Sequence, residues 1–242
     1  MKHLLIAAAS LGLAFVLPAP TLAQDTAASQ PAQQTAYVDL VAAMQNGIDQ
    51  ELVIDNQLAV VRSIWQADPN MVAAEATYPG LFDAMIDAGR PVIMRHNQEL
   101  QDEFRPRYVA ALAEALTEQE AARIAEFYRS PLGVKMLGGL SRTMDSRATI
   151  EGGVANGEID IKDFDKDVRK SAGQIVGSLS AEEQSELVRL FTTDPALMKM
   201  NDLQAIVVPI RADMEKAGMA PARQKEIEAA IQNAAERHIA GG

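Results

Sequence analysis

Cysteine is absent from this 242-residue chain, and histidine and aromatic residues are scarce. Without cysteine there can be no disulfides, thiolate metal ligands or cysteine nucleophiles. The fold must therefore be stabilised by its packed core. Of the three histidines, His3 lies at the start and His238 near the end, so His96 alone sits in a predicted interior helix. One histidine makes neither a catalytic triad nor a metal site, and His96 is expected to occupy an ordinary hydrogen-bonded helix position.

Long apolar runs are also missing, apart from residues 4–17. A helix needs about 20 apolar residues to cross a bilayer, and this run is shorter. Lys2 precedes it, and Thr21-Leu22-Ala23 supplies the small residues that a signal peptidase requires. This pattern predicts a cleavable signal peptide over residues 1–23, with cleavage after Ala23 and a periplasmic product. An uncleaved amino-terminal anchor is the alternative.

Basic residues are outnumbered, with 22 Lys and Arg against 33 Asp and Glu. Loss of Lys2 with the signal would leave a net charge of −12. A phosphate backbone would be repelled by such a chain, and no stripe of Lys and Arg offsets the repulsion. We therefore expect no nucleic-acid partner.

The remaining sequence carries helical periodicity almost throughout. Residues 24–36 are polar and predict a disordered lead. Amino-terminal helices are expected over residues 37–90. Between Val41 and Trp65, apolar residues recur at three- and four-residue spacing, which predicts one long helix or two with a bend near Asp55. Asp68-Pro69 should cap and open a helix, and breaks are expected at residues 78–80 and 89–91, with a long helix from about Pro91.

Two capped units follow. Thr117 and Glu120 have the spacing of a capping box, and Ser130-Pro131 should end one helix and open the next. Ser180 and Glu183 repeat the box, and Asp194-Pro195 repeats the cap. The matching residues of the two units are Leu116, Glu120, Pro131, Lys135 and Met136 in the first, and Leu179, Glu183, Pro195, Lys199 and Met200 in the second.

This correspondence predicts two related helical hairpins, over residues 91–150 and 167–242, joined by an acidic glycine-rich loop over residues 151–166. A weaker third copy could lie around Trp65 and Pro69. No segment shows the alternation of a strand. The predicted fold is an all-α bundle of eight to ten helices.

The first unit resembles a known family. Its pattern is T-x-x-E, a helix, then F-Y-x-S-P-x-G and a basic or polar residue soon after; here it begins at Thr117 and ends at Lys135. These features are similar to an exported Gram-negative family catalogued as domain of unknown function twenty fifty-nine. The resemblance covers about residues 91–150 and implies a helical periplasmic domain without a known activity. The candidate surface of this motif comprises Phe127, Tyr128, Ser130, Pro131, Gly133 and Lys135.

Three residue patterns could carry chemistry, but each also has a structural explanation. Ser130 and Lys135 could form a nucleophile and its base, but Ser130 stands where a helix cap is needed. Asp163, Asp165 and Asp167 have calcium-loop spacing, but Val168 replaces the required glycine. Met198 and Met200 could bind copper, yet residues two apart point to different faces of a helix. We expect no catalytic residue, metal or cofactor.

Two functions are considered, of which the first is favoured and the second is the alternative. The first is a non-catalytic envelope protein that binds another protein, or itself, through apolar helix faces. The second is a periplasmic carrier of a lipid or other apolar ligand. Its ligand would lie between helices that carry the aromatic residues Trp65, Phe82, Phe104, Tyr108, Phe127 and Tyr128. The surroundings of Tyr128 distinguish a functional motif from an architectural one. If Tyr128 lines an open cleft, the motif is functional; if Tyr128 is fully buried, the motif is architectural.

Overall fold

The computed structural model describes residues 35–143, 170–171 and 173–241. These residues form helices and connections without a strand, so the predicted all-α class is confirmed. The helices are α2 (Thr35–Asn46), α3 (Gln50–Ala67), α4 (Pro69–Thr77), α5 (Leu81–Ala115), α6 (Glu118–Arg129), α7 (Pro131–Thr143), α10 (Ala181–Thr193), α11 (Pro195–Met198), α12 (Met200–Gly218) and α13 (Pro221–Gly241). Within the described ranges, no helix is long and apolar enough to cross a membrane.

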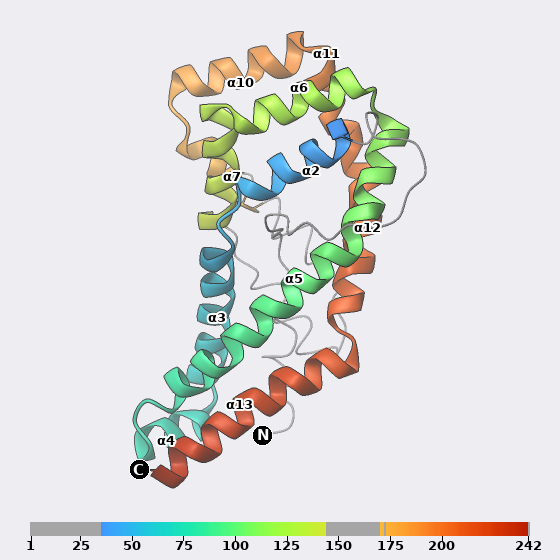
Figure 1. Cartoon of the computed structure of the whole chain (residues 1–242). Helices are drawn as coiled ribbons and strands as arrows, with labels where there is room; N and C mark the ends of the chain where they lie inside the picture. Colours follow the sequence, from blue (N-terminus) through green and yellow to red (C-terminus); the bar gives the residue numbers. More distant parts are fainter. Residues whose placement is uncertain (1–34, 144–169, 172, 242) are drawn as a thin grey trace.

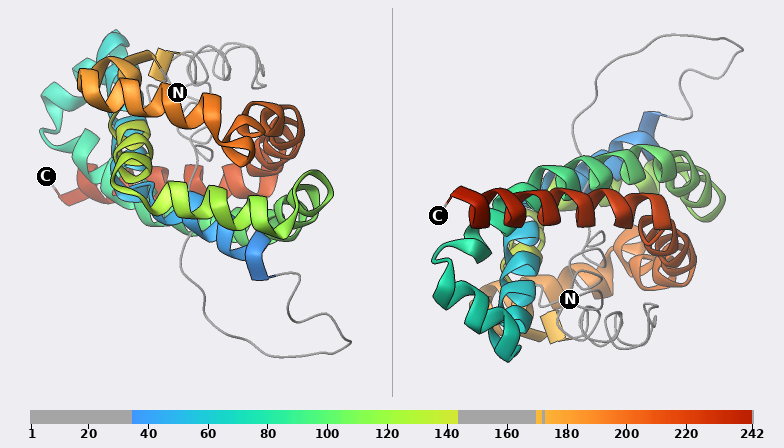
Figure 2. Two further views of the ribbon diagram at one scale, coloured as in Figure 1. Left: turned by 90° about the horizontal axis from the view of Figure 1, so that it is seen from above. Right: turned by 90° about the horizontal axis from the view of Figure 1, so that it is seen from below.

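Helix α5 is the diagonal spine of the molecule (Figure 1). The last helix, α13, lies along α5, as the view from below also shows (Figure 2). Helix α12 packs on the second half of α5, where Arg107 pairs with Asp213 at 2.5 Å. Helices α2 and α6 pack together near the end of α5, and the Tyr37 hydroxyl donates to the Leu116 carbonyl at 2.9 Å. Both ends of α5 are thereby covered.

Two main apolar cores lie along this spine. The first joins α3, α4, the start of α5 and α13 around Trp65, whose ring contacts that of Phe82. The second joins α2, the end of α5, α6, α11 and α12 around Phe127 and Leu197. Burial of apolar surface at about 25 cal/mol per Å² is the main stabilising contribution in a chain without disulfides.

The break expected at residues 89–91 is wrong, because α5 continues through it. The division between residues 90 and 91 therefore falls inside a helix. Pro91 and Pro106 are both exposed. The hydrogen bonds lost at their missing amides can be made to water there, which lowers the cost of an internal proline. Gly89 lies against Ile231 of α13, so it serves close helix packing.

Other boundaries also differ from expectation. Helix α2 starts at Thr35, two residues inside the predicted lead, and the α2–α3 break lies at residues 47–49 and not near Asp55. Asp49 caps α3 by accepting from the amide of Leu52 at 3.0 Å. Beyond Pro195 the chain forms the short α11 and then α12, with Lys199 between them. The polar cap residue Asp49 thus sets the break between α2 and α3, which the apolar periodicity alone did not reveal.

The other predicted caps are confirmed. Asp68 accepts from Asn70 and Met71, and Pro69 opens α4. The turn at residues 78–80 is also present, and Gly80 has φ of 89°, a conformation that favours glycine. Glu75 completes this turn, because its carboxylate accepts from the amides of Gly80 and Phe82, each at 2.8 Å.

Several predicted segments lie outside the described residues. They are the signal peptide at 1–23, the lead at 24–34, the acidic loop at 151–166 and the aspartates at 163, 165 and 167. The predicted relationship between two helical hairpins stays a prediction.

Candidate functional site

Helix caps at Thr117 and Ser130 define the local structure of the family-like motif. Thr117 accepts from the amide of Glu120 at 3.3 Å, and the Glu120 carboxylate accepts from the amide of Thr117 at 2.9 Å. Ser130 accepts from the amide of Gly133 at 3.1 Å, which confirms its role as a cap. These bonds satisfy amides that the first turns of α6 and α7 would otherwise leave without partners.

Ser130 and Lys135 are each engaged with other groups. The Ser130 hydroxyl donates to the Phe127 carbonyl at 2.6 Å, and the Lys135 ammonium lies 2.5 Å from Glu183 Oε2. A nucleophilic serine needs its hydroxyl directed to a base. The contacts of both residues are those of a cap and an ion pair.

Gly133 allows α7 to start directly against the end of α6. A Cβ atom placed on Gly133 would lie 2.1 Å from the Phe127 carbonyl oxygen and 2.7 Å from the Tyr128 Cα. Such distances are far inside van der Waals contact, and both obstructing atoms belong to the backbone. The glycine is therefore required by the sharp turn from α6 to α7.

The two aromatic residues of the motif have different surroundings. Phe127 is buried in the core, where its ring meets that of Phe191 edge to face at a centroid distance of 5.6 Å. The neighbouring Tyr128 lines a cavity. Burial raises the pKa of Tyr128 to about 12, so its phenol is neutral at physiological pH. Phe127 therefore has a packing role, whereas Tyr128 borders a partly open cavity.

This cavity has a volume of about 380 Å³. Its lining comes from α2, α5, α6, α7, α10 and α12 and is mostly aliphatic, with methionines that adapt to irregular shapes. The lining residues are Val41, Met44, Gln45, Ile48, Gln101, Tyr108, Leu112, Ile124, Tyr128, Met136, Leu137, Leu140, Phe191, Met200, Leu203, Val207, Arg211 and Met214. Pockets that hold small ligands span about 300–1,000 Å³ and are mainly apolar, so this one falls within that class.

Only part of the aromatic set predicted for a ligand site reaches this cavity. Tyr108 and Tyr128 line it. The other four aromatics are core residues: Trp65 and Phe82 in the first core, Phe127 in the second, and Phe104 in a smaller cluster with Leu100. These four therefore fill the core, because large aromatic side chains gain most from full burial in close-packed surroundings.

A few polar groups interrupt the apolar lining. Gln45 and Gln101 are only 4% and 2% exposed, and Gln45 Nε2 and Gln101 Oε1 have no hydrogen-bond partner among the described residues. Arg211 is also buried, and its Nε donates to Glu215 Oε1 at 2.5 Å. Burial raises the pKa of Glu215, although Arg211 opposes this shift. Buried polar groups without hydrogen-bond partners are rare in proteins. Gln45 and Gln101 therefore distinguish the part of the cavity wall that they form from its aliphatic remainder.

Sequence reasoning missed Gln45 and Gln101, although a signal was present. Gln45 follows Val41 by four residues and precedes Ile48 by three, and Gln101 follows Asn97 by four and precedes Phe104 by three. Both amides thus occupy positions of an apolar helix face. A polar residue at a core-facing position is the pattern that would have identified them.

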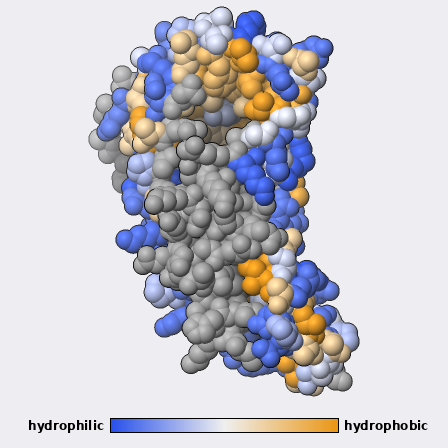
Figure 3. Space-filling view, turned by 180° about the vertical axis from the view of Figure 1, so that it is seen from behind, coloured by the Kyte–Doolittle hydropathy of each residue, from blue (hydrophilic) through white to orange (hydrophobic). Residues whose placement is uncertain are grey.

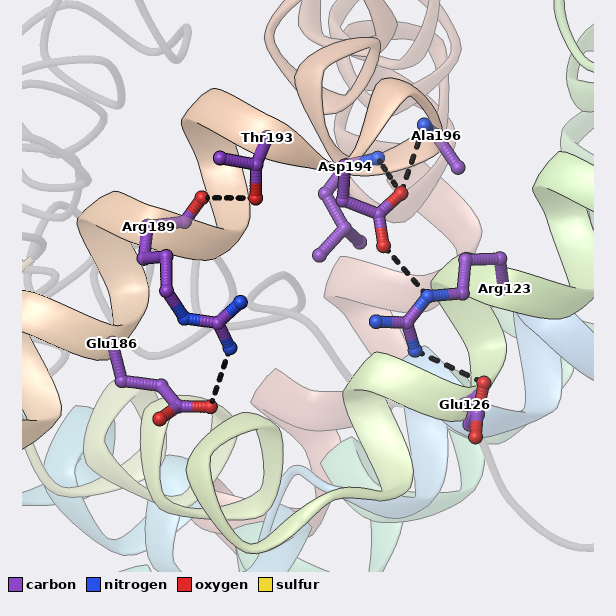
Figure 4. Close-up of polar contacts among 8 residues, drawn as sticks. Arg123, Glu126, Glu186, Arg189, Thr193, Asp194 and Ala196 are labelled. Atoms are coloured by element: carbon purple, nitrogen blue, oxygen red, sulfur yellow. Dashed lines mark hydrogen bonds and ion pairs between the residues drawn. The ribbon is translucent and has the colours of Figure 1, made fainter.

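A second hollow of about 430 Å³ lies between α6 and α10 and includes Phe127, Ser130 and Pro131 of the motif. Figure 4 shows its ion pairs. Arg123 of α6 donates to Asp194 at 2.7 Å and to Glu126 at 3.0 Å. Asp194 also caps α11 through the amides of Ala196 and Leu197. Burial raises the pKa of Asp194, but these hydrogen bonds outweigh it and lower that pKa overall.

Two ion pairs link the capped units reciprocally. Lys135 of α7 pairs with Glu183, the box glutamate of α10, and Lys199 pairs at 2.7 Å with Glu120, the box glutamate of α6. The bond from Lys199 and that from the Thr117 amide lower the pKa of Glu120 to about 2. Lys135 and the Ser180 amide lower the pKa of Glu183 in the same way.

The residues considered as metal ligands are dispersed. His96 is buried and its Nε2 lies 2.8 Å from Glu226 Oε2, so it is a hydrogen-bonded helix residue as expected. Met200 lines the cavity while Met198 is half exposed, so the two thioethers do not converge. Across residues 35–143, 170–171 and 173–241, no group of three or more His, Cys, Asp or Glu side chains could hold a metal ion.

Comparison with known proteins gives one match. No curated protein and no solved structure matches the chain. The resemblance predicted from the motif is confirmed, because residues 102–145, from the second half of α5 through α6 and α7, match the model of the family described as uncharacterized protein conserved in bacteria (DUF2059).

Proposed function

We propose that this chain is an exported, non-catalytic carrier that holds an apolar ligand in the cavity beside Tyr128. The observation that carries the proposal is the cavity itself, with about 380 Å³ of space inside a largely aliphatic wall. The cavity is partly open, so its apolar lining faces water when no ligand is bound. Apolar surface left in water costs about 25 cal/mol per Å², and a bound apolar ligand would remove that cost.

The family-like motif supports this proposal. Gly133 fixes the turn between α6 and α7, and this turn places Tyr128 of α6 and Met136 of α7 on the same cavity wall. The contacts of Ser130 and Lys135 favour a binding function over a catalytic one, since their polar atoms are used in a cap and an ion pair.

Titration calorimetry with two single-chain compounds, 1-decanol and decanoate, tests the proposal. We expect saturable binding of at least one compound with a negative heat-capacity change, the mark of apolar burial. The variant Val207→Phe should fill the cavity, abolish binding and raise the melting temperature. Its matched control is Val188→Phe, at a valine that is 63% exposed and outside the cavity, which should leave binding unchanged.

The result that contradicts the proposal is equally defined. If neither compound binds a wild-type protein that circular dichroism shows to be folded, the cavity is not a carrier site for single chains. The same holds if Val207→Phe and Val188→Phe bind as the wild type does.

Export rests on residues 1–23 and is tested separately. We expect the intact mass of the protein recovered from the periplasmic fraction to correspond to a chain that starts at Gln24. A full-length mass in the membrane fraction would favour the uncleaved anchor.

A protein-binding function is the second candidate, and surface composition favours it. Of the large exposed apolar side chains among the described residues, Val134, Val176, Val188 and Met198 lie between residues 134 and 198, and Val38, Val72 and Ile239 lie elsewhere. Figure 3 shows apolar residues gathered at the end of the molecule where α10 lies. Light scattering after size exclusion tests self-association, which Val188→Glu should weaken; a wild-type monomer at all concentrations would contradict self-association.

A further inference from the structure

The polar part of the cavity indicates what kind of ligand end it receives. This step rests on the proposed carrier function and adds the chemistry of the ligand. On α5 the lining residues run from Gln101 through Tyr108 to Leu112, and on α12 from Met200 through Val207 and Arg211 to Met214. Leu203 of α12 packs in the same core as Leu112, whereas Met214 packs with Leu100, so α12 runs along α5 in the opposite direction.

Because α5 and α12 are antiparallel, Gln101 and Arg211 lie toward one end of the helix pair, and Leu112 and Leu203 toward the other. Val41 of α2 packs in the same core as Leu112 and Leu203, and Gln45 follows Val41 by one helical turn away from that apolar end. The two buried carboxamides and Arg211 therefore lie toward one end of the cavity, where Ile48 and Met214 also line it, and the other end is aliphatic.

The charges at the polar end are balanced. Arg211 is paired with Glu215, so the guanidinium does not contribute an unopposed positive charge. Among the residues that line the cavity, the buried atoms without a partner are one donor, Gln45 Nε2, and one acceptor, Gln101 Oε1. Glu215 Oε2 is a further buried acceptor without a hydrogen-bond partner, but Glu215 does not line the cavity. A carboxylate can only accept hydrogen bonds and would leave the Gln101 oxygen facing a negative charge. An ammonium without acceptor atoms would leave the Gln45 donor unpaired.

We propose that the cavity selects a single-chain amphiphile with an uncharged head that both donates and accepts hydrogen bonds, such as a primary amide or a hydroxyl. A water molecule takes about 30 Å³ of liquid volume, so the cavity of about 380 Å³ holds roughly a dozen groups of that size. The ligand is therefore a chain of about ten carbons with a small head. Each carboxamide of the protein then completes the hydrogen bonds that burial demands.

Four decyl compounds separate the head groups at constant chain length: decanamide, 1-decanol, decanoate and decyltrimethylammonium, titrated at pH 8. Decanamide and decanoate have the same number of heavy atoms, so they differ in charge and donor capacity and not in size. We expect decanamide and 1-decanol to bind about tenfold or more tightly than the two charged compounds. Monodecanoylglycerol forms a further arm, which distinguishes the glycerol head of a lipid fragment from a free chain.

The variants Gln45→Leu and Gln101→Leu should fold, because an apolar residue replaces an unpaired amide. Each should reduce the preference for decanamide over decanoate to about threefold or less while still binding 1-decanol. Gln98→Leu on α5 is the matched control, since Gln98 hydrogen-bonds Asp102 and does not line the cavity.

Equal affinity for all four head groups, or tighter binding of decanoate, would overturn the inference about the head while leaving the carrier function intact. An unchanged preference in both glutamine variants would overturn it too. If no decyl compound binds the folded protein, the carrier function itself fails. Tighter binding of monodecanoylglycerol supports the uncharged class and identifies a lipid fragment as its source.

Discussion

Lys135 of α7 forms an ion pair with Glu183 of α10, with its ammonium nitrogen 2.5 Å from the carboxylate. Lys199 and Glu120, which occupy the corresponding sequence positions, form the reciprocal pair at 2.7 Å. Each glutamate also caps the first turn of its own helix. Local capping and long-range contact between the two units therefore share the same carboxylates.

Three variants at the first pair separate these two roles. We expect Glu183→Ala to lower the melting temperature more than Lys135→Met, because alanine loses both the ion pair and the hydrogen bond from the Ser180 amide at 2.8 Å. Glu183→Gln should resemble Lys135→Met, since glutamine can still accept from that amide. Thermal unfolding measures all three; equal losses in Lys135→Met and Glu183→Ala would mean that the cap adds nothing.

The pKa of Glu120 predicts a dependence of stability on acid. Its folded-state pKa of about 2 lies below the ordinary value of 4.5, so the unfolded chain binds the proton more readily. The resulting stability is fully present above pH 4.5 and is lost as the pH falls toward 2. We expect Glu120→Gln to show a shallower fall in melting temperature than the wild type across this range.

The control for this experiment is Glu118→Gln, in the same helical turn. Glu118 forms no ion pair with the described residues, so this variant should follow the wild-type pH profile. Parallel profiles for wild type and Glu120→Gln would show that the capping carboxylate is not held in its charged form.

Structural features that depend on residues close together in the sequence could be predicted, and features that depend on contacts between distant residues could not. The caps at Asp68, Thr117, Ser130 and Asp194 were predicted correctly, because a cap involves residues two or three positions apart. The break at Gly89 and Pro91 was not, because α13 packs against this segment from more than a hundred residues away. Tertiary packing overrode the local signal.

The cavity could not be predicted in the same way. Its wall combines residues of six helices, and no sequence pattern states which faces meet. Tyr128 was named from the motif and does line the cavity, but Phe127 and Trp65 are core residues. Gln45 and Gln101 could have been noticed as polar residues on apolar faces, yet their convergence on one cavity follows only from the packing of α2 against α5.

Ser130 tests whether the motif serine is a cap. We expect Ser130→Ala to lower the free energy of unfolding by about 1 kcal/mol, because the Gly133 amide loses its acceptor. Ser185→Ala, inside α10, is the control; its hydroxyl bonds only to the Ala181 carbonyl, and alanine favours the helix by a few tenths of a kcal/mol. Chemical denaturation compares the two, and an unchanged midpoint in Ser130→Ala would count against the cap.

Gly133 gives the most severe test of the motif as architecture. We expect Gly133→Ala to destabilise the protein by more than about 2 kcal/mol, because its Cβ would lie 2.1 Å from the backbone oxygen of Phe127. Gly138 lies on the same helix, and a Cβ there would meet only the Arg142 side chain at 3.6 Å. Gly138→Ala should therefore stabilise the protein by about 0.5–1 kcal/mol through helix propensity. Denaturant unfolding of both variants decides the matter: opposite signs require the tight turn between α6 and α7, whereas stabilisation by both would place these helices further apart and remove Tyr128 and Met136 from a common wall.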